Sequence, residues 1–198
     1  MNLKDKLHKA IPYNEYRTTI EGLVAEKKTS GPTQNEDYAH YTLMNFQRMK
    51  RLEKTTQLSE SFEKKITNFK RKLIWLILTE AWCGDAAQNI PVLEKIASSA
   101  PHISTLYLFR DEHIDLIDHY LTNGGRSIPK LICLDENSME VLGTWGPRPF
   151  TIQRFINKLK EEGITDLKET IEKVQVAYNH DGTVSLQEEI SHLLDKWS

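Results

Sequence analysis

Leu-Ile-Trp-Leu-Ile-Leu at residues 73–78, followed by Trp-Cys-Gly-Asp-Ala at residues 82–86, is the stretch that decides the fold. The first segment is a short run without a polar side chain, which is typical of a strand buried on both faces of a sheet. After the second segment, apolar side chains recur at helical spacing through residues 90–97, so a helix is expected there. Cys83 is therefore predicted to lie where a buried strand turns into a helix.

The segments that follow predict an α/β protein. Residues 103–109 form a second apolar run, and residues 114–121 have the spacing of an amphipathic helix that ends at Asn-Gly-Gly. Residues 130–135 and 140–144 have the pattern of a strand hairpin, and another helix is expected from about residue 152. The order β-α-β-α-β-β-α predicts a central mixed β-sheet flanked by helices.

Helical segments flank this central region on both sides. Residues 1–69 contain amphipathic helical patterns, and we expect this N-terminal extension to pack on the core. Residues 70–162 form the predicted central domain. Residues 163–198 contain two more apolar stripes at helical spacing, which predict a C-terminal helical hairpin.

Three motifs resemble the thioredoxin family. The turn at residues 82–86 resembles the family's Trp-Cys-Gly-Pro-Cys turn, and residues 126–131 (RSIPKL) resemble its Arg-x-Ile-Pro-Thr-Leu segment. Residues 141–146 (VLGTWG) are similar to the hairpin strand that ends in a glycine near the active site. The motifs occur in the family's order within residues 70–160. The Trp-Cys-Gly-Asp turn with flanking helices is similar to a bacterial subgroup of thioredoxin-like proteins.

This resemblance implies a thioredoxin-like fold with Cys83 as the nucleophile. It also implies a cis peptide bond before Pro129, beside Cys83, where the backbone of Ile128 would pair with an extended substrate segment. Trp82 and Trp145 would then border the same apolar surface. The residues expected to contact substrate are Trp82, Gly84, Asp85, Ile128, Pro129 and Trp145.

The position of Cys83 predicts a reactive thiol. A helix N-terminus directs unpaired N–H groups and partial positive charge at the sulfur, which lowers the pKa of a thiol. Asp85 has two opposing effects, because its charge suits the helix terminus but repels a thiolate. We expect an exposed nucleophile. The alternatives are that Cys83 is a small buried apolar residue and that Asp85 only stabilises the first turn of the helix.

Two departures from the family pattern exclude the ordinary dithiol cycle. Ala86 stands where the family has its resolving cysteine, and Ile77 stands where it has a buried acid. The other cysteine, Cys133, follows Pro129 by four residues, which is about 13 Å along a strand. Because a disulfide needs Cα atoms within about 7 Å, Cys133 is predicted to be a core residue.

These residues favour a monothiol thiol–disulfide oxidoreductase. Cys83 would attack a mixed disulfide of a protein or peptide, and a low-molecular-weight thiol would release it. No cofactor is expected beyond that small thiol as co-substrate. Two alternatives stay open: a redox-inactive binding module for a partner protein or peptide, and a sensor or thiol transferase in which Cys83 is modified reversibly.

Composition limits the partners and the location. The formal net charge is −2, and no apolar run approaches the about 20 residues that span a bilayer, so neither nucleic acid nor a membrane is an expected partner. Residues 48–72 are rich in Lys and Arg, but the scarcity of interleaved aromatic residues favours a solvated helix face. The histidines form no metal-binding motif, so no metal site is expected. Two cysteines and a polar N-terminal stretch favour a cytoplasmic location.

Overall fold

The computed structural model describes residues 3–198 and has a four-stranded sheet of order β2-β1-β3-β4 at its centre. β1 (Leu73–Thr79) pairs in parallel with β2 (Ile103–Phe109) and antiparallel with β3 (Lys130–Asp135). β3 also pairs antiparallel with β4 (Val141–Trp145). β1 and β3 are buried along their whole length, as strands with neighbours on both sides and helices on both faces should be. The predicted mixed sheet is confirmed.

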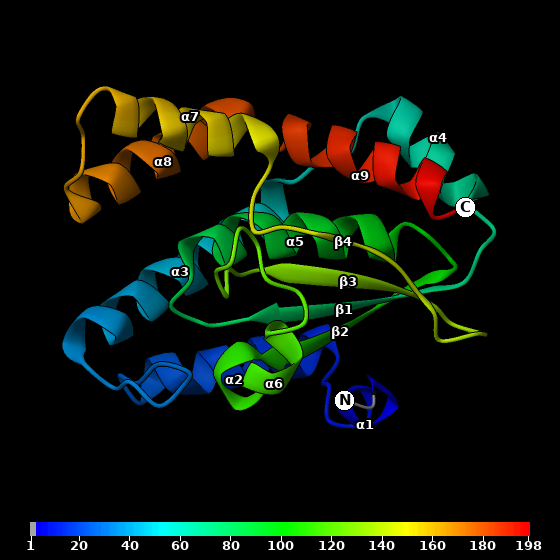
Figure 1. Cartoon of the computed structure of the whole chain (residues 1–198), viewed down its shortest axis with the longest axis horizontal. Helices are drawn as coiled ribbons and strands as arrows, with labels where there is room; N and C mark the ends of the chain where they lie inside the picture. Colours follow the sequence, from blue (N-terminus) through cyan, green and yellow to red (C-terminus); the bar gives the residue numbers. More distant parts are fainter. Residues whose placement is uncertain (1–2) are drawn as a thin grey trace.

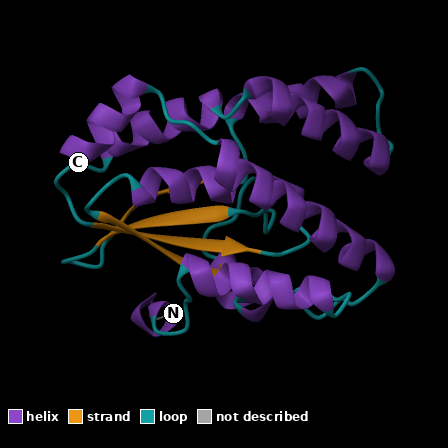
Figure 2. Ribbon diagram, turned by 180° about the vertical axis from the view of Figure 1, so that it is seen from behind, coloured by secondary structure: helices purple, strands orange, loops and turns teal. Residues whose placement is uncertain are grey.

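Helices cover both faces of this sheet, and a further helical layer lies outside α5 (Figure 1 and Figure 2). α5 (Gly84–Ser98) lies on one face, whereas α2 (Tyr13–Ala25) and α6 (Ile114–Ile117) lie on the other. None of the helices within residues 3–198 is long and apolar enough to cross a membrane. The other helices are α1 (Leu3–Leu7), α3 (Glu36–Thr55), α4 (Glu60–Asn68), the 3-10 helix η1 (Arg110–Glu112), α7 (Phe150–Glu161), α8 (Leu167–Asp181) and α9 (Val184–Lys196).

The segment before β1 packs on the sheet. Ile11 forms an isolated antiparallel bridge with Tyr107 at the free edge of β2. One helix later, the Tyr16 ring stacks on the Tyr107 ring with 4.9 Å between centroids. α3 then packs against both α2 and α5. This segment therefore covers an otherwise unpaired edge and buries aromatic surface on the core.

The C-terminal helices make two different contacts with the rest of the chain. Trp197, directly after α9, is buried and lies edge-on to Trp75 of β1, with 6.5 Å between ring centroids. α7 and α8 instead pack on each other through a separate apolar cluster. The buried members of that cluster are Ile152, Ile156, Leu159, Val174 and Tyr178. The α7–α8 hairpin thus has its own small core.

One predicted helix is shorter than its pattern suggested. The apolar spacing extends over residues 114–121, but α6 ends at Ile117. The chain then turns through Asn123 and Gly124, which both have positive φ values of 50° and 77°. Asn and Gly adopt this left-handed conformation more easily than other residues. This turn prevents the helical segment from resuming before β3, although it does not account for the end of α6 at Ile117.

Candidate functional site

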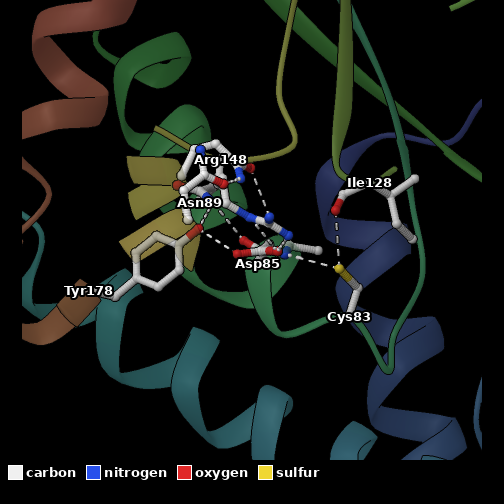
Figure 3. A network of polar contacts seen from close by, with 9 residues as sticks. Cys83, Asp85, Asn89, Ile128, Arg148 and Tyr178 are labelled. Atoms are coloured by element: carbon white, nitrogen blue, oxygen red, sulfur yellow. Dashed lines mark hydrogen bonds and ion pairs between the residues drawn. The ribbon is translucent and has the colours of Figure 1, made fainter. Parts of the chain in front are cut away.

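Cys83 lies at the start of α5, where the sequence predicted it. Its sulfur accepts a hydrogen bond from the Ala86 backbone N–H at 3.5 Å, as an N-cap side chain does. The thiol donates to the carbonyl oxygen of Ile128 at 3.3 Å (Figure 3). The Ile128–Pro129 peptide bond is cis, as the family resemblance implied. The structure therefore brings together Cys83, Ile128 and Pro129.

The Cys83 thiol is buried and protonated in this arrangement. The residue is 8% exposed, and burial, followed by the charge of Asp85, raises the pKa of its thiol to about 12. The backbone N–H groups of Ala86 and Asp85 and the charge of Arg148 act in the opposite direction. The prediction of an exposed thiol with a lowered pKa is wrong, because the helix N-terminus cannot compensate for desolvation and a neighbouring carboxylate.

Asp85 has a larger role than first-turn stabilisation. One carboxylate oxygen accepts two hydrogen bonds from the Arg148 guanidinium, at 3.0 and 2.5 Å. The other accepts the Tyr178 hydroxyl at 2.6 Å, and that hydroxyl also accepts from the Asn89 amide at 3.0 Å (Figure 3). Asp85 therefore joins the start of α5 to the loop before α7 and to α8.

α8 covers the first turns of α5. The Gln88 side-chain amide donates to the Gln175 side-chain oxygen at 2.8 Å. A Cβ atom on Gly84 would lie 3.1 Å from the Gln175 side-chain nitrogen, so the two helices are in close contact at this point. The predicted substrate residues Gly84 and Asp85 both face α8.

Trp82 is half-buried beside α3. Its ring stacks on the Tyr38 ring with 5.1 Å between centroids, and the Arg110 guanidinium lies 5.1 Å from its ring centroid. The Asn45 side chain of α3 donates to the carbonyl oxygen of Ala81, directly before Trp82, at 3.1 Å. Trp82 is thus fixed by the N-terminal helices and by the loop after β2.

Trp145 does not form an open surface with Trp82. It is 6% exposed, and its indole N–H donates to the Glu189 carboxylate of α9 at 2.7 Å. Ile128 is buried as well, at 5% exposed. The expected apolar border around Cys83 is therefore closed at Trp145, because α9 covers this end of β4. Cys133 is fully buried on β3 opposite Trp75, as expected of a core residue.

Several polar residues of this region were not predicted from the sequence. Arg148 lies in a loop between Pro147 and Pro149, and nothing in the local pattern indicated that it would reach Asp85. Tyr178 belongs to the apolar stripe of α8, so the sequence did not indicate that its hydroxyl would bind Asp85. Of the missed residues, Glu80 could have been found from the sequence, because a carboxyl group that directly follows the apolar run of β1 is expected to be buried.

Glu80 is a buried carboxyl group three residues before Cys83. It is fully buried, accepts the Asp111 backbone N–H at 2.8 Å and accepts the Ser30 hydroxyl. Burial raises the pKa of Glu80 to about 7, although both hydrogen bonds favour the ionised form. Glu80 therefore carries a proton in the folded protein at a pH where an exposed glutamate has lost it.

This raised pKa predicts a pH-dependent stability. An unfolded chain releases the Glu80 proton near pH 4.5 and the folded chain near pH 7, so the free energy of unfolding falls as the pH rises between these values. The slope is at most about 1.4 kcal/mol per pH unit. We expect Glu80→Gln to remove this fall, as measured by urea unfolding at several pH values. Glu60→Gln, at an exposed helix position, is the control. An identical pH dependence in wild type and Glu80→Gln would contradict the assignment.

Metal and cofactor chemistry has no further support from the side chains. Among residues 3–198, no group of three or more His, Cys, Asp or Glu side chains is arranged to hold a metal ion. The two cysteines are both free thiols. The ionisable groups at the start of α5 include the Cys83 thiol and the charged pair of Asp85 and Arg148.

The comparisons with known proteins agree with the geometry. A solved structure of a protein of unknown function from Pseudomonas aeruginosa is 18% identical over 88% of this chain and 94% of that one, with a TM-score of 0.55. An HIV epitope scaffold is 20% identical over 86% of this chain and 98% of that one, with a TM-score of 0.51. Both share the fold. A comparison with curated proteins gives no match. The thioredoxin family model matches residues 31–162, which include α3, α4 and the whole sheet, and the chain therefore belongs to the thioredoxin family.

Proposed function

We propose that this chain is a monothiol thiol–disulfide oxidoreductase that acts through Cys83. The observation that carries the proposal is the place of the sulfur: it caps α5 and lies 3.3 Å from the carbonyl oxygen of Ile128, next to Pro129. Cys133, the other cysteine, is buried in the middle of the sheet. Ala86 occupies the position of a resolving thiol, so the Trp-Cys-Gly-Asp turn supports one-thiol chemistry.

The reaction takes place in two exchange steps. The Cys83 thiolate attacks one sulfur of a protein or peptide mixed disulfide, forms a new disulfide to that sulfur and expels the other sulfur as a thiolate. A low-molecular-weight thiolate then attacks that new disulfide at the substrate sulfur and releases Cys83 as a thiolate. Each step breaks one S–S bond and forms one, and no other oxidant or reductant is needed. A reducing compartment such as the cytoplasm supplies the small thiol.

The Cys83 thiolate has to form in a more open arrangement than the one described above, in which the sulfur is buried. We call the buried state the closed arrangement. In the closed arrangement burial raises the pKa of Cys83 to about 12. The α8 cover contacts α5 through polar side chains, from Gln175 to Gln88 and from Tyr178 to Asp85. Such contacts exchange readily for water. Separating α8 from α5 would loosen the start of α5, and hydration of the sulfur there would leave the N–H groups of α5 in place to stabilise the thiolate.

Turnover of a mixed disulfide tests this function. The probe is a peptide–glutathione mixed disulfide with free glutathione as the external thiol, and the readout is the rate of peptide thiol release. We expect wild type and Cys133→Ser to accelerate release equally and Cys83→Ser to give only the uncatalysed rate. Equal rates in wild type and Cys83→Ser would overturn the proposal.

A redox-inactive binding module is the second candidate. The 8% exposure of Cys83 and the raised pKa of its thiol favour it, because a protonated and shielded sulfur is a poor nucleophile. A partner protein held equally by wild type and Cys83→Ser, together with no mixed-disulfide turnover, would support this function. Turnover that requires Cys83 would exclude it.

A further inference from the structure

A cavity of about 330 Å³ lies between α3, α5, α8 and the turn before α9. Its wall includes Arg51 and Thr56 from α3 and its end, Gln88 and Asn89 from α5, and Tyr178 from α8. Cys83 is not part of this wall. The volume falls in the range of small-molecule sites, and the wall holds several polar side chains from different elements.

Three polar side chains in this wall each have an oxygen with no hydrogen-bond partner among residues 3–198. Asn89 is 1% exposed, and its side-chain nitrogen donates to the Asp85 carbonyl and to the Tyr178 hydroxyl. Its side-chain oxygen accepts no hydrogen bond from any of residues 3–198. Gln88, at 5% exposed, likewise uses its nitrogen on Gln175 and leaves its oxygen free, and the Thr56 hydroxyl is buried without a partner. The two amide oxygens are free acceptors in the cavity wall, so a ligand with N–H donors would match them.

The mouth of the cavity carries positive charge. Arg51 donates to the Asn179 side-chain oxygen at 2.9 Å, and Arg48, one turn earlier on α3, donates to Asn45 at 2.6 Å. Neither arginine has a carboxylate within 4.0 Å in the described part of the chain. Burial and the charge of Arg51 lower the pKa of Arg48, in agreement with two uncompensated cations. An anionic group beside Arg51 would relieve this repulsion.

The acidic group in the wall does not neutralise Arg51. Both carboxylate oxygens of Asp181 accept hydrogen bonds from Ser185, one from its hydroxyl and one from its backbone N–H at 3.3 Å. Asp181 therefore holds the first turn of α9. Its negative charge still favours a cationic group elsewhere in the cavity, which matches the donor requirement of Asn89 and Gln88.

The geometry points to this cavity as a binding site for a free α-amino acid, with its carboxylate on Arg51 and its ammonium group toward the side-chain oxygens of Asn89 and Gln88. A single carboxylate matches the guanidinium fork of Arg51. An ammonium group supplies the N–H donors that the two oxygens lack. A phosphate or a dicarboxylate fits less well, because its second anionic part would face acceptor oxygens. The site does not use the Cys83 thiol, so it is independent of the proposed oxidoreductase function.

Binding of the free amino acids tests the inference. Each of the common L-amino acids is added at up to about 10 mM, and binding is measured by thermal unfolding and by isothermal calorimetry. We expect the amino acids of one side-chain class to raise the melting temperature of the wild-type protein. The decarboxylated amine of a bound amino acid should bind at least about tenfold more weakly, because it lacks the group for Arg51.

Matched variants locate the site. Arg51→Met keeps the length of an exposed side chain and removes its charge, and we expect it to weaken binding by about tenfold or more. Lys54→Met removes an exposed charge from the same helix, outside the cavity wall, and should bind like wild type. Cys83→Ser should also bind the amino acid like wild type. Binding in the cavity can then be judged separately from the proposed oxidoreductase activity of Cys83. No binding by any amino acid, or equal binding by wild type and Arg51→Met, would overturn the inference.

Discussion

Asp85→Asn is expected to make the Cys83 thiol react about tenfold faster with iodoacetamide at about pH 7.5. The Asp85 carboxylate raises the pKa of Cys83, whereas Arg148 and the backbone N–H groups of the helix start lower it. Burial stays as the largest cause of the raised pKa, but removing the carboxylate removes the second cause, so the pKa falls. A lower pKa increases the fraction of thiolate about tenfold per pH unit, and the lower nucleophilicity of the more acidic thiolate offsets about half of that gain on a logarithmic scale.

The pH profile of alkylation identifies the cause of this increase. In wild type the rate should keep rising through about pH 10 without a plateau, because the pKa lies near 12. In Asp85→Asn the rate should begin to level off at a lower pH. Glu60→Gln, which removes a charge from the first turn of α4, is the matched control and should follow wild type. An unchanged or slower reaction in Asp85→Asn would show that its charge does not control the thiol.

Gly146→Ala is expected to give the largest loss of stability, about 3 kcal/mol or more. Gly146 has φ of +112°, which an alanine adopts only with strain. A Cβ atom at this position would lie 2.2 Å from the carbonyl oxygen of Pro129, far closer than such atoms can approach. The loop that holds Pro129 beside Cys83 would have to move. Urea unfolding of the purified variant measures the effect.

Gly22→Ala in α2 is the control for this substitution. An added Cβ meets nothing within 4 Å there, and Gly22 has a helical backbone. Alanine should therefore stabilise the protein by about 0.5–1 kcal/mol, because it loses less conformational freedom on folding. Equal effects of the two substitutions would contradict the close contact between Gly146 and Pro129.

The sequence predicted most of the fold because local patterns and tertiary packing agree in this chain. The apolar run of β1 is buried on both faces, as continuous hydrophobicity required. β2 and β3 match their predicted bounds, Ile103–Phe109 and Lys130–Asp135. The early end of α6 was missed, since its apolar spacing continues to residue 121, whereas the helix ends at Ile117.

The candidate site was predicted less completely. Cys83, Ile128 and Pro129 come together as expected, since they follow or precede strands that pair directly with each other. Trp145 does not border an open surface with Trp82, because α9 covers it and Glu189 binds its indole. A local pattern cannot indicate which face a distant helix will cover.

By itself, the sequence determined the identity and position of one thiol at the start of a helix, and the absence of a resolving partner at Ala86. Those properties depend on residues that are adjacent along the chain. Only the tertiary structure decided the protonation state of that thiol. Burial and the charge of Asp85 raise the pKa of Cys83 by more than the helix start and Arg148 lower it. Desolvation depends on all surrounding segments, including the one that holds Ile128, which lies 45 residues further along the chain.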